Sequence, residues 1–306
     1  MKQLYPLIAL FIFVLTGCKK NPQDIFNEQK SGVVLICNQY YYDLTLASGE
    51  HLYFSGLDEK GQFVNLTSNL ANIRRQPGVL NGTGFFIDNS GNILTNRHVV
   101  APAVDKVTVK NNINNIIQNY TKYIQALQDS MSQRYAALQQ YAQQNIYQDY
   151  YGNTRTNLSN EEIVALQQEV ETLKAQYEQA ENLKNSVWNN ILSDNFSIRL
   201  HSQFGIAYDG DNVNSWDDFM KRPCSLIRVS EDAHSDLALL QLNSKQTPDG
   251  HYVFTVDNTL ATNDKQLEIN QPVFMIGYNY GMALAKTDNG IRAQFTSGTV
   301  TQQPDG

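Results

Sequence analysis

The chain has 306 residues, of which 42% are hydrophobic, and a net charge of −7 at pH 7. Its length allows one large or two ordinary domains, and its hydrophobic fraction is high enough to build their cores. The excess of acidic residues argues against nucleic acid as a partner, because phosphate binding requires clustered Lys and Arg.

The first thirty residues have the pattern of an export signal followed by a tether. Lys2 precedes an apolar run over residues 4–15, which is too short to span a bilayer comfortably but is typical of a secretory signal. Leu15-Thr16-Gly17-Cys18 resembles a bacterial lipobox, which implies cleavage before Cys18 and lipid on its sulfur. A plain signal peptide and an uncleaved anchor are the alternatives. We expect a signal peptide at 1–17, a polar tether at 18–30, and lipid-anchored export to the bacterial cell envelope, on the periplasmic or outer-membrane face.

Two further cysteines, Cys37 and Cys224, are far apart in the sequence. The compartment beyond the inner membrane permits disulfides, but this spacing fixes no pairing. A Cys37–Cys224 bridge and two buried thiols both remain open.

From Ser31 to Lys110, short apolar runs alternate with breakers, which is typical of strands. The most informative run is 82–100, where two apolar arms flank an Asn-Ser-Gly-Asn turn and a histidine follows the second arm. The stretch 55–80 is irregular and polar. Besides the hairpin arms, the expected strands are 32–37, 38–46, 51–54 and 106–110.

At Asn111 the apolar period changes from two to about three and a half, which predicts helices that pack through a seam. A break at 150–153 separates two such segments, and Ser159 with the following acids predicts the start of the second. The first seam contains Ile117, Tyr120, Ile124, Leu127, Met131 and Leu138, and the second Leu166, Val170, Leu173, Tyr177, Ala180, Val187 and Ile191. We expect an antiparallel coiled-coil hairpin over 111–194. The sequence leaves open whether the hairpin binds a partner, gates a cleft, sets the oligomeric state or buries only its own seam.

After Asn195 the strand pattern resumes. Because strands of matching character flank the helical segment, the simplest interpretation is a β-domain interrupted by the hairpin. The expected strands are 197–201, 204–208, 224–229 and 236–242, followed by a linker at 246–250 and the start of a second β-unit around 274–277 and 293–296.

The hairpin 82–100 resembles the histidine motif of trypsin-like serine peptidases, in the version of the bacterial HtrA-type proteases. Gly82-Thr83-Gly84-Phe85-Phe86 opens it, and Leu94-Thr95-Asn96-Arg97-His98 closes it in the way the family places its base. Acyl transfer by serine needs a base, an acid group that orients the base, and the serine beside backbone donors. The resemblance therefore implies that His98 is the general base.

A second segment, Asp236-Leu237-Ala238-Leu239-Leu240, resembles the family element whose aspartate holds the imidazole tautomer. We expect Asp236 to be a buried carboxylate whose desolvation is offset by the imidazole N–H. His98 alone would more often be a structural histidine, and Asp236 alone a turn residue. His234 is a rival base without a motif of its own. No His or Cys pair has the spacing of a zinc site, and we expect no metal and no cofactor.

The third match is the Gly277-Tyr278-Asn279-Tyr280-Gly281 turn, similar to the Gly-x-Pro-x-Gly region that opens the family's second barrel but with Asn279 in place of proline. Ser297 lies on the strand expected to follow and is not interpreted as the nucleophile. The printed residues contain no Gly-x-Ser-Gly motif. We therefore expect a C-terminally truncated chain that is itself inactive, because it lacks the nucleophile and the oxyanion hole.

The resulting fold class is mainly β, a trypsin-like double β-barrel with an incomplete second barrel and an inserted antiparallel α-helical coiled-coil hairpin. The expected function is a serine endopeptidase that hydrolyses polypeptides. The alternative is a non-catalytic envelope lipoprotein that uses the same fold and the hairpin as a binding module. Beyond the signal and tether, the expected segments are the first barrel at 31–110 and 195–247, the helical insert at 111–194, and the start of the second barrel at 248–306.

Overall fold

The computed structural model describes residues 21–191, 196–232, 234–255 and 268–302. The chain divides into two compact units, each formed by segments that are distant in sequence. By residue content the fold is mixed, with 37% helix and 31% strand, and it contains a closed six-stranded antiparallel barrel. The predicted signal peptide at 1–17 and the lipid-attachment residue Cys18 lie outside the described residues.

Most residues of the barrel strands belong to the unit made of residues 1–40, 78–103 and 201–306, whereas residues 41–45, 51–54 and 197–200 of the same sheet belong to the other unit. The strands follow the order β1-β5-β6-β11-β10-β9, and β9 pairs with β1 to close the barrel, while β2 extends β1 at one side. These strands are β1 (Val33–Thr45), β2 (His51–Phe54), β5 (Gly78–Phe86), β6 (Asn92–Thr95), β9 (Ser197–Tyr208), β10 (Pro223–Val229) and β11 (Ala238–Leu242).

Strand β1 is buried on both faces, which explains the continuous apolar run that begins it. Val34 and Ile36 belong to one core cluster with Phe86, Ile93 and Leu240, all fully buried. The intervening residues of β1 belong to a second cluster, because successive side chains of a strand point to opposite faces. That second cluster contains Val33, Leu35, Cys37, Ala207, Val213, Phe219, Tyr278, Ala285, Ile291 and Ala293.

Residues 268–302 supply part of this second cluster and form two separate two-stranded sheets. The elements are β12 (Pro272–Gly277), α7 (Met282–Ala285), β13 (Lys286–Thr287), β14 (Gly290–Ile291) and β15 (Gln294–Thr299). The segment is attached to the barrel at β5, where the Tyr278 N–H donates to Thr83 Oγ1 at 2.8 Å. Ser297 lies within β15 opposite Phe274, in the strand position expected for it.

The predicted tether is wrong over part of its length. Helix α1 (Pro22–Gln29) begins with proline and is capped by Asn21, whose side chain accepts from the Asp24 N–H. Phe26 packs against the second core cluster and contacts the ring of Phe295, with 5.4 Å between centroids. The packing of Phe26 and the cap by Asn21 therefore order a segment whose composition is polar.

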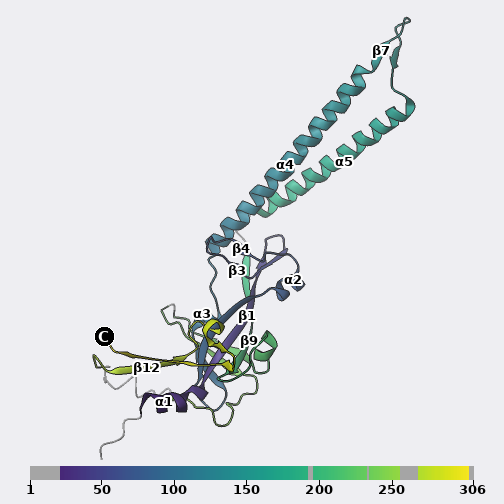
Figure 1. Ribbon diagram of the computed structural model, residues 1–306. Coiled ribbons are helices and arrows are strands. Elements are labelled where there is room, and N and C mark those ends of the chain that lie inside the picture. Colours follow the sequence, from purple (N-terminus) through teal and green to yellow (C-terminus); the bar gives the residue numbers. More distant parts are fainter. Residues whose placement is uncertain (1–20, 192–195, 233, 256–267, 303–306) are drawn as a thin grey trace, which may run out of the picture. The chain divides into compact units, whose positions relative to one another are not determined.

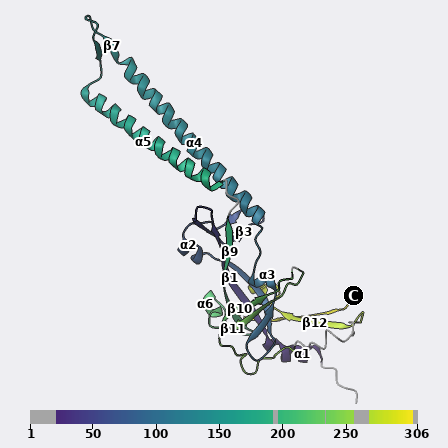
Figure 2. The ribbon, with the colours of Figure 1, turned by 180° about the vertical axis from the view of Figure 1, so that it is seen from behind.

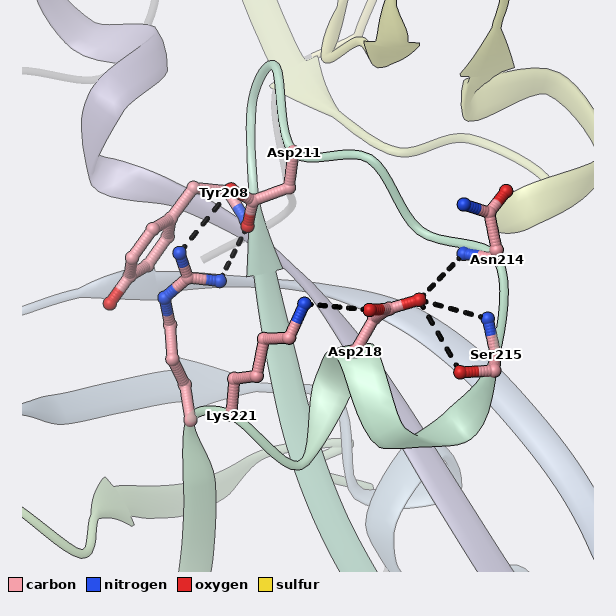
Figure 3. A network of polar contacts seen from close by, with 7 residues as sticks. Tyr208, Asp211, Asn214, Ser215, Asp218 and Lys221 are labelled. Atoms are coloured by element: carbon pink, nitrogen blue, oxygen red, sulfur yellow. Dashed lines mark hydrogen bonds and ion pairs between the residues drawn. The ribbon is translucent and has the colours of Figure 1, made fainter.

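The loop between β9 and β10 is held by two carboxylates (Figure 3). Asp211 accepts from both terminal nitrogens of Arg222 and from the Tyr208 N–H, and the Arg222 guanidinium lies 4.1 Å from the centre of the Tyr208 ring. Asp218 caps the short helix α6 (Trp216–Phe219). The hydrogen bond from Lys221, together with those from two backbone N–H groups, lowers the pKa of the Asp218 carboxyl. This network fixes the loop that carries the buried Phe219.

The second unit contains the predicted helical hairpin. Helices α4 (Lys106–Gln144) and α5 (Asn160–Ile191) run antiparallel and side by side (Figure 1, Figure 2). The short strands β7 (Ile146–Gln148) and β8 (Thr154–Thr156) pair at its tip. Ser159 and Glu162 exchange hydrogen bonds at the start of α5, as the capping pattern predicts. The remaining elements are β3 (Gly56–Leu57), β4 (Phe63–Val64) and α2 (Leu70–Arg75).

The predicted strand at 106–110 is wrong, because these residues form the first turn of α4. The alternation of Lys106-Val-Thr-Val-Lys110 matches a strand, but Asp105 precedes it and caps a helix. The Asp105 carboxylate accepts from the backbone N–H groups of Val107 and Thr108. The cap supplies acceptors for two N–H groups that have no partner inside the helix, which favours a helix that starts here.

The two cysteines of the barrel unit are free and buried. Cys37 belongs to the second core cluster and Cys224 to the first. Of the two alternatives left open by the sequence, the structure therefore shows two buried thiols. Burial raises the pKa of each thiol to about 12.

Candidate active site

The pairing of β6 with β11 brings two distant loops to the same end of the barrel. The strands are antiparallel, with Thr95 opposite Ala238 and Ile93 opposite Leu240. The chain that leaves β6 after Thr95 and the chain that enters β11 before Ala238 therefore lie side by side. His98 follows Thr95 by three residues and Asp236 precedes Ala238 by two.

His98 and Asp236 are in direct contact, although they are 138 positions apart in the sequence. The Nδ1 atom of His98 lies 2.6 Å from Oδ2 of Asp236. The backbone N–H of His98 donates to the other carboxylate oxygen at 3.0 Å. Two contacts to one residue fix both the position of the carboxylate and the orientation of the imidazole ring.

Asn96 is a third member of this arrangement, and the sequence analysis did not single it out. Its side-chain amide donates to Oδ2 of Asp236 at 3.0 Å and to the backbone oxygen of Asp236 at 3.1 Å. Asn96 also stands directly before helix α3 (Arg97–Val100), which carries His98. An asparagine at the junction of a strand and a helix start was the available signal, but it is equally typical of an ordinary cap.

Residues of β1 and β5 contact helix α3 and hold it in place. The buried Asn38 side chain donates to the backbone oxygen of Val99 at 2.9 Å. Gly82 lies so close to Val99 that a Cβ at position 82 would overlap the valine side chain. The glycine is therefore required by close packing, and it lets α3 approach the sheet that positions His98.

Asp236 is more exposed than the sequence predicted. Its side chain is 49% exposed and that of His98 is 68% exposed. The expectation of a buried carboxylate is wrong because Asp236 precedes β11 in a loop at the barrel end, whereas burial begins at Ala238. At this exposure, solvent screens the attraction between the two side chains, so their contact orients the ring more than it stabilises the fold.

The electrostatic surroundings favour an ionised Asp236. Partial desolvation raises the pKa of its carboxyl, but the hydrogen bonds from the backbone and side chain of His98, with a smaller one from Asn96, lower it by more. The net pKa lies below the ordinary value of 3.8. The carboxylate is therefore charged at neutral pH and can accept an N–H from Nδ1 of His98, while Nε2 is the ring nitrogen that Asp236 does not contact.

The other histidines are placed differently. The His234 backbone N–H donates to Asp232, and its side chain makes no hydrogen bond within the part of the chain that the structure describes. His251 packs against Tyr208, with 4.5 Å between ring centroids. His201 lies in β9. None of these three joins Asp236.

A second His–Asp pair lies on the β1–β2 hairpin, in the unit that does not contain His98. Nδ1 of His51 is 2.7 Å from Oδ1 of Asp43. Asp43 pairs with Tyr53 and Thr45 pairs with His51, so the two side chains meet diagonally across the strands. The sequence offered no motif here, and only the strand register reveals the contact.

Over the described ranges, no group of three or more His, Cys, Asp or Glu side chains is arranged to hold a metal ion. No helix among the same residues is long and apolar enough to cross a membrane.

No protein-family model matches the chain, and no curated protein matches it significantly. Functional assignment therefore depends on the residues and contacts described above.

Proposed function

We propose that this chain carries the general base and the orienting carboxylate of a serine endopeptidase of the trypsin-like class. The observation that carries the proposal is the 2.6 Å contact between His98 Nδ1 and Asp236 Oδ2, reinforced by the His98 N–H on the other oxygen. His98 is the base, Asp236 orients it, and the substrate is a polypeptide.

The geometry supports a defined order of proton movements. Asp236 accepts from Nδ1, so Nε2 has a free lone pair and takes the proton of an attacking serine hydroxyl. The ring then becomes an imidazolium, which the ionised Asp236 stabilises, and it returns the proton to the leaving amine. Asn96 and the His98 N–H hold the carboxylate through this cycle.

In this proposal the six-stranded barrel is the first of the two barrels of the trypsin-like fold, and the β12–β15 pair begins the second. Helices α4 and α5 form a coiled-coil insert in the first barrel. The proposal requires a nucleophilic serine in a Gly-x-Ser-Gly motif, which the printed residues do not contain, and it assigns Cys18 to a lipid anchor in the bacterial cell envelope. The closed antiparallel barrel and the placement of both motif residues at one of its ends support this assignment.

The test uses the complete gene product in its native membrane fraction and a serine-reactive fluorophosphonate probe. We expect covalent labelling of the wild type, loss of labelling in His98→Ala, and a drop in peptidase rate of about 10⁴-fold in Asp236→Asn, because the wrong tautomer then prevails. His234→Ala is the matched control and retains full labelling. A reading frame without a Gly-x-Ser-Gly-x-Pro motif after Gly306, or a wild type that is not labelled, would overturn the proposal.

One observation favours the alternative of a non-catalytic envelope lipoprotein that acts as a binding module. The hairpin carries two cavities of about 350 and 380 Å³ along its helices, away from the His98 motif in sequence. The labelling experiment separates the two functions, since a binding module leaves the probe unreacted in every variant.

A further inference from the structure

A polar cavity of about 570 Å³ lies beside helix α2, within the unit that contains residues 41–77. Its lining comes from the chain that follows β4 and from α2 with its C-terminal cap: Asn65, Leu66, Thr67, Asn72, Arg75 and Gln76. Five of these six side chains are polar and none is acidic. The volume far exceeds the share of about 30 Å³ that one water molecule takes in the liquid, so an organic molecule can enter the cavity.

The lining side chains offer mainly hydrogen-bond donors. The Arg75 guanidinium has five N–H donors, and its Nη2 group donates to Oδ1 of Asn72. This partner is a neutral amide, and no carboxylate in the described part of the chain forms an ion pair with Arg75. The Asn72 oxygen already accepts that bond, so its NH2 group is the part that remains available. The Gln76 amide and the Thr67 hydroxyl can donate as well.

Two oxygens beside the cavity already accept hydrogen bonds. Thr67 Oγ1 accepts from the Asn69 backbone N–H at 3.1 Å. The backbone oxygen of Gln76 accepts from the side-chain amide of Asn65 at 3.2 Å, and the same amide donates to Ser55 Oγ at 3.1 Å. The bond to Gln76 matters because this residue ends α2, where an unpaired carbonyl would repel an anion. The cavity therefore suits a ligand that carries acceptors and negative charge.

We propose that this cavity, which we call the Arg75 cavity, binds the carboxylate of a small organic molecule. The planar fork of an arginine matches the two oxygens of a carboxylate through parallel hydrogen bonds. The carboxylate supplies the counter-charge that Arg75 lacks, and the amides of Asn72 and Gln76 pair with polar groups next to it. A peptide C-terminus and a sugar acid both present this chemistry. Because Arg75 is exposed, solvent screens the charge pair, and we expect a dissociation constant of about 1 mM.

Nuclear magnetic resonance titration of the full chain tests the proposal, read at the Arg75 Nε–H and at the backbone amides of α2. The probes are N-acetyl-Ala-Ala, the same dipeptide with a C-terminal amide, glucuronate, and inorganic phosphate, all at one ionic strength. The amide-capped dipeptide should bind at least about tenfold more weakly than the free acid, because it replaces a charge-assisted pair with a neutral one. Saturation by N-acetyl-Ala-Ala identifies a peptide C-terminus as the source, and saturation by glucuronate alone identifies a sugar acid.

Three variants and a matched control locate the site. Arg75→Gln should raise the dissociation constant by about tenfold or more, and Arg75→Lys by less, since lysine keeps the charge but not the fork. Asn72→Asp should also weaken binding, because it places a carboxylate three residues before Arg75 on the same helix face, where it competes with the ligand. The control is Arg74→Gln, which changes the net charge equally on the same helix but lies outside the cavity lining.

Circular dichroism and the melting temperature of each variant confirm that the chain is folded. The proposal is overturned if neither carboxylate saturates these resonances, if phosphate binds as tightly as the carboxylates, or if Arg74→Gln and Arg75→Gln have equal effects. The titration needs no peptidase activity, so its result is independent of the proposed catalytic function.

Discussion

Gly82→Ala tests whether close packing beneath α3 positions His98. The new Cβ would lie 2.9 Å from Cγ1 of Val99 and closer still to Cγ2, whereas ordinary contacts begin near 3.4 Å. Val99 is 3% exposed and β-branched, so it has little freedom to rotate away. Overpacking of this kind costs about 1–3 kcal/mol of unfolding free energy. For a unit of this size, each kcal/mol lowers the melting temperature by about 2–4 °C.

Val99→Ala supplies the rescue that makes the test specific. Alone it removes two buried methyl groups and costs about 2 kcal/mol, from lost burial and the cavity left behind. In the double variant the alanine Cβ at position 82 occupies part of that cavity. The double variant should therefore be more stable than the sum of the single changes predicts, by about 1–3 kcal/mol.

The measurement is urea unfolding followed by the fluorescence of Trp216, which packs against the second core cluster of the barrel unit. The chain has two tryptophans, so a Trp188→Phe background leaves Trp216 as the only reporter. Gly298→Ala is the control, because its Cβ would meet only Val273, at 3.7 Å. Additive effects at positions 82 and 99, or an equal loss of stability in the control, would refute the packing argument.

Three further predictions concern the same unit. Asn38→Ala should cost about 1–3 kcal/mol of unfolding free energy in urea titrations, because the backbone oxygen of Val99 then loses its buried donor. The carboxyl of Asp236 has a folded-state pKa below 3.8. Its contribution to stability is therefore full above pH 3.8 and is lost as the pH falls through the folded-state pKa. In Asp236→Asn the melting temperature should depend less on pH in that acidic range. Burial raises the pKa of the Cys37 and Cys224 thiols to about 12, so both should resist a thiol-specific disulfide reagent at pH 8 in the native chain. Both should react in guanidinium. Mass spectrometry of the labelled peptides measures the reaction.

Local sequence patterns predicted β5, β6 and the histidine that follows them better than they predicted the contacts around His98 and Asp236. The run 82–100 gave β5, its turn, β6 and the histidine after it, because strand alternation and turn residues act over short distances. The period of the helical segment gave α4 and α5 for the same reason. The contact between His98 and Asp236 came from a resemblance, since nothing in the spacing of two residues 138 positions apart specifies a strand register.

The failures share one physical cause, which is that a single polar or aromatic contact outweighed composition. Asp105 turned an alternating stretch into the start of α4 through two hydrogen bonds. Phe26 ordered a polar segment by reaching the core. Asn38 and Asn96 hold α3 and Asp236 through contacts with residues distant in sequence. The contacts of Asn38 and Asn96 are long-range, whereas the cap by Asp105 is local. Neither kind of contact can be obtained from the periodicity of apolar residues.

The long segment of chain between His98 and Asp236 does not prevent the two side chains from being held in fixed relative positions. Helices α4 and α5 are antiparallel, so the inserted chain returns to the end of the hairpin from which it started. Extra length in a connection is thermodynamically inexpensive, because each doubling adds only about 0.6 kcal/mol of closure entropy. The relative positions of the two side chains are set instead by the register of β6 with β11, which pairs Thr95 with Ala238. The hairpin can therefore be accommodated within this connection without changing the strand register that joins His98 to Asp236.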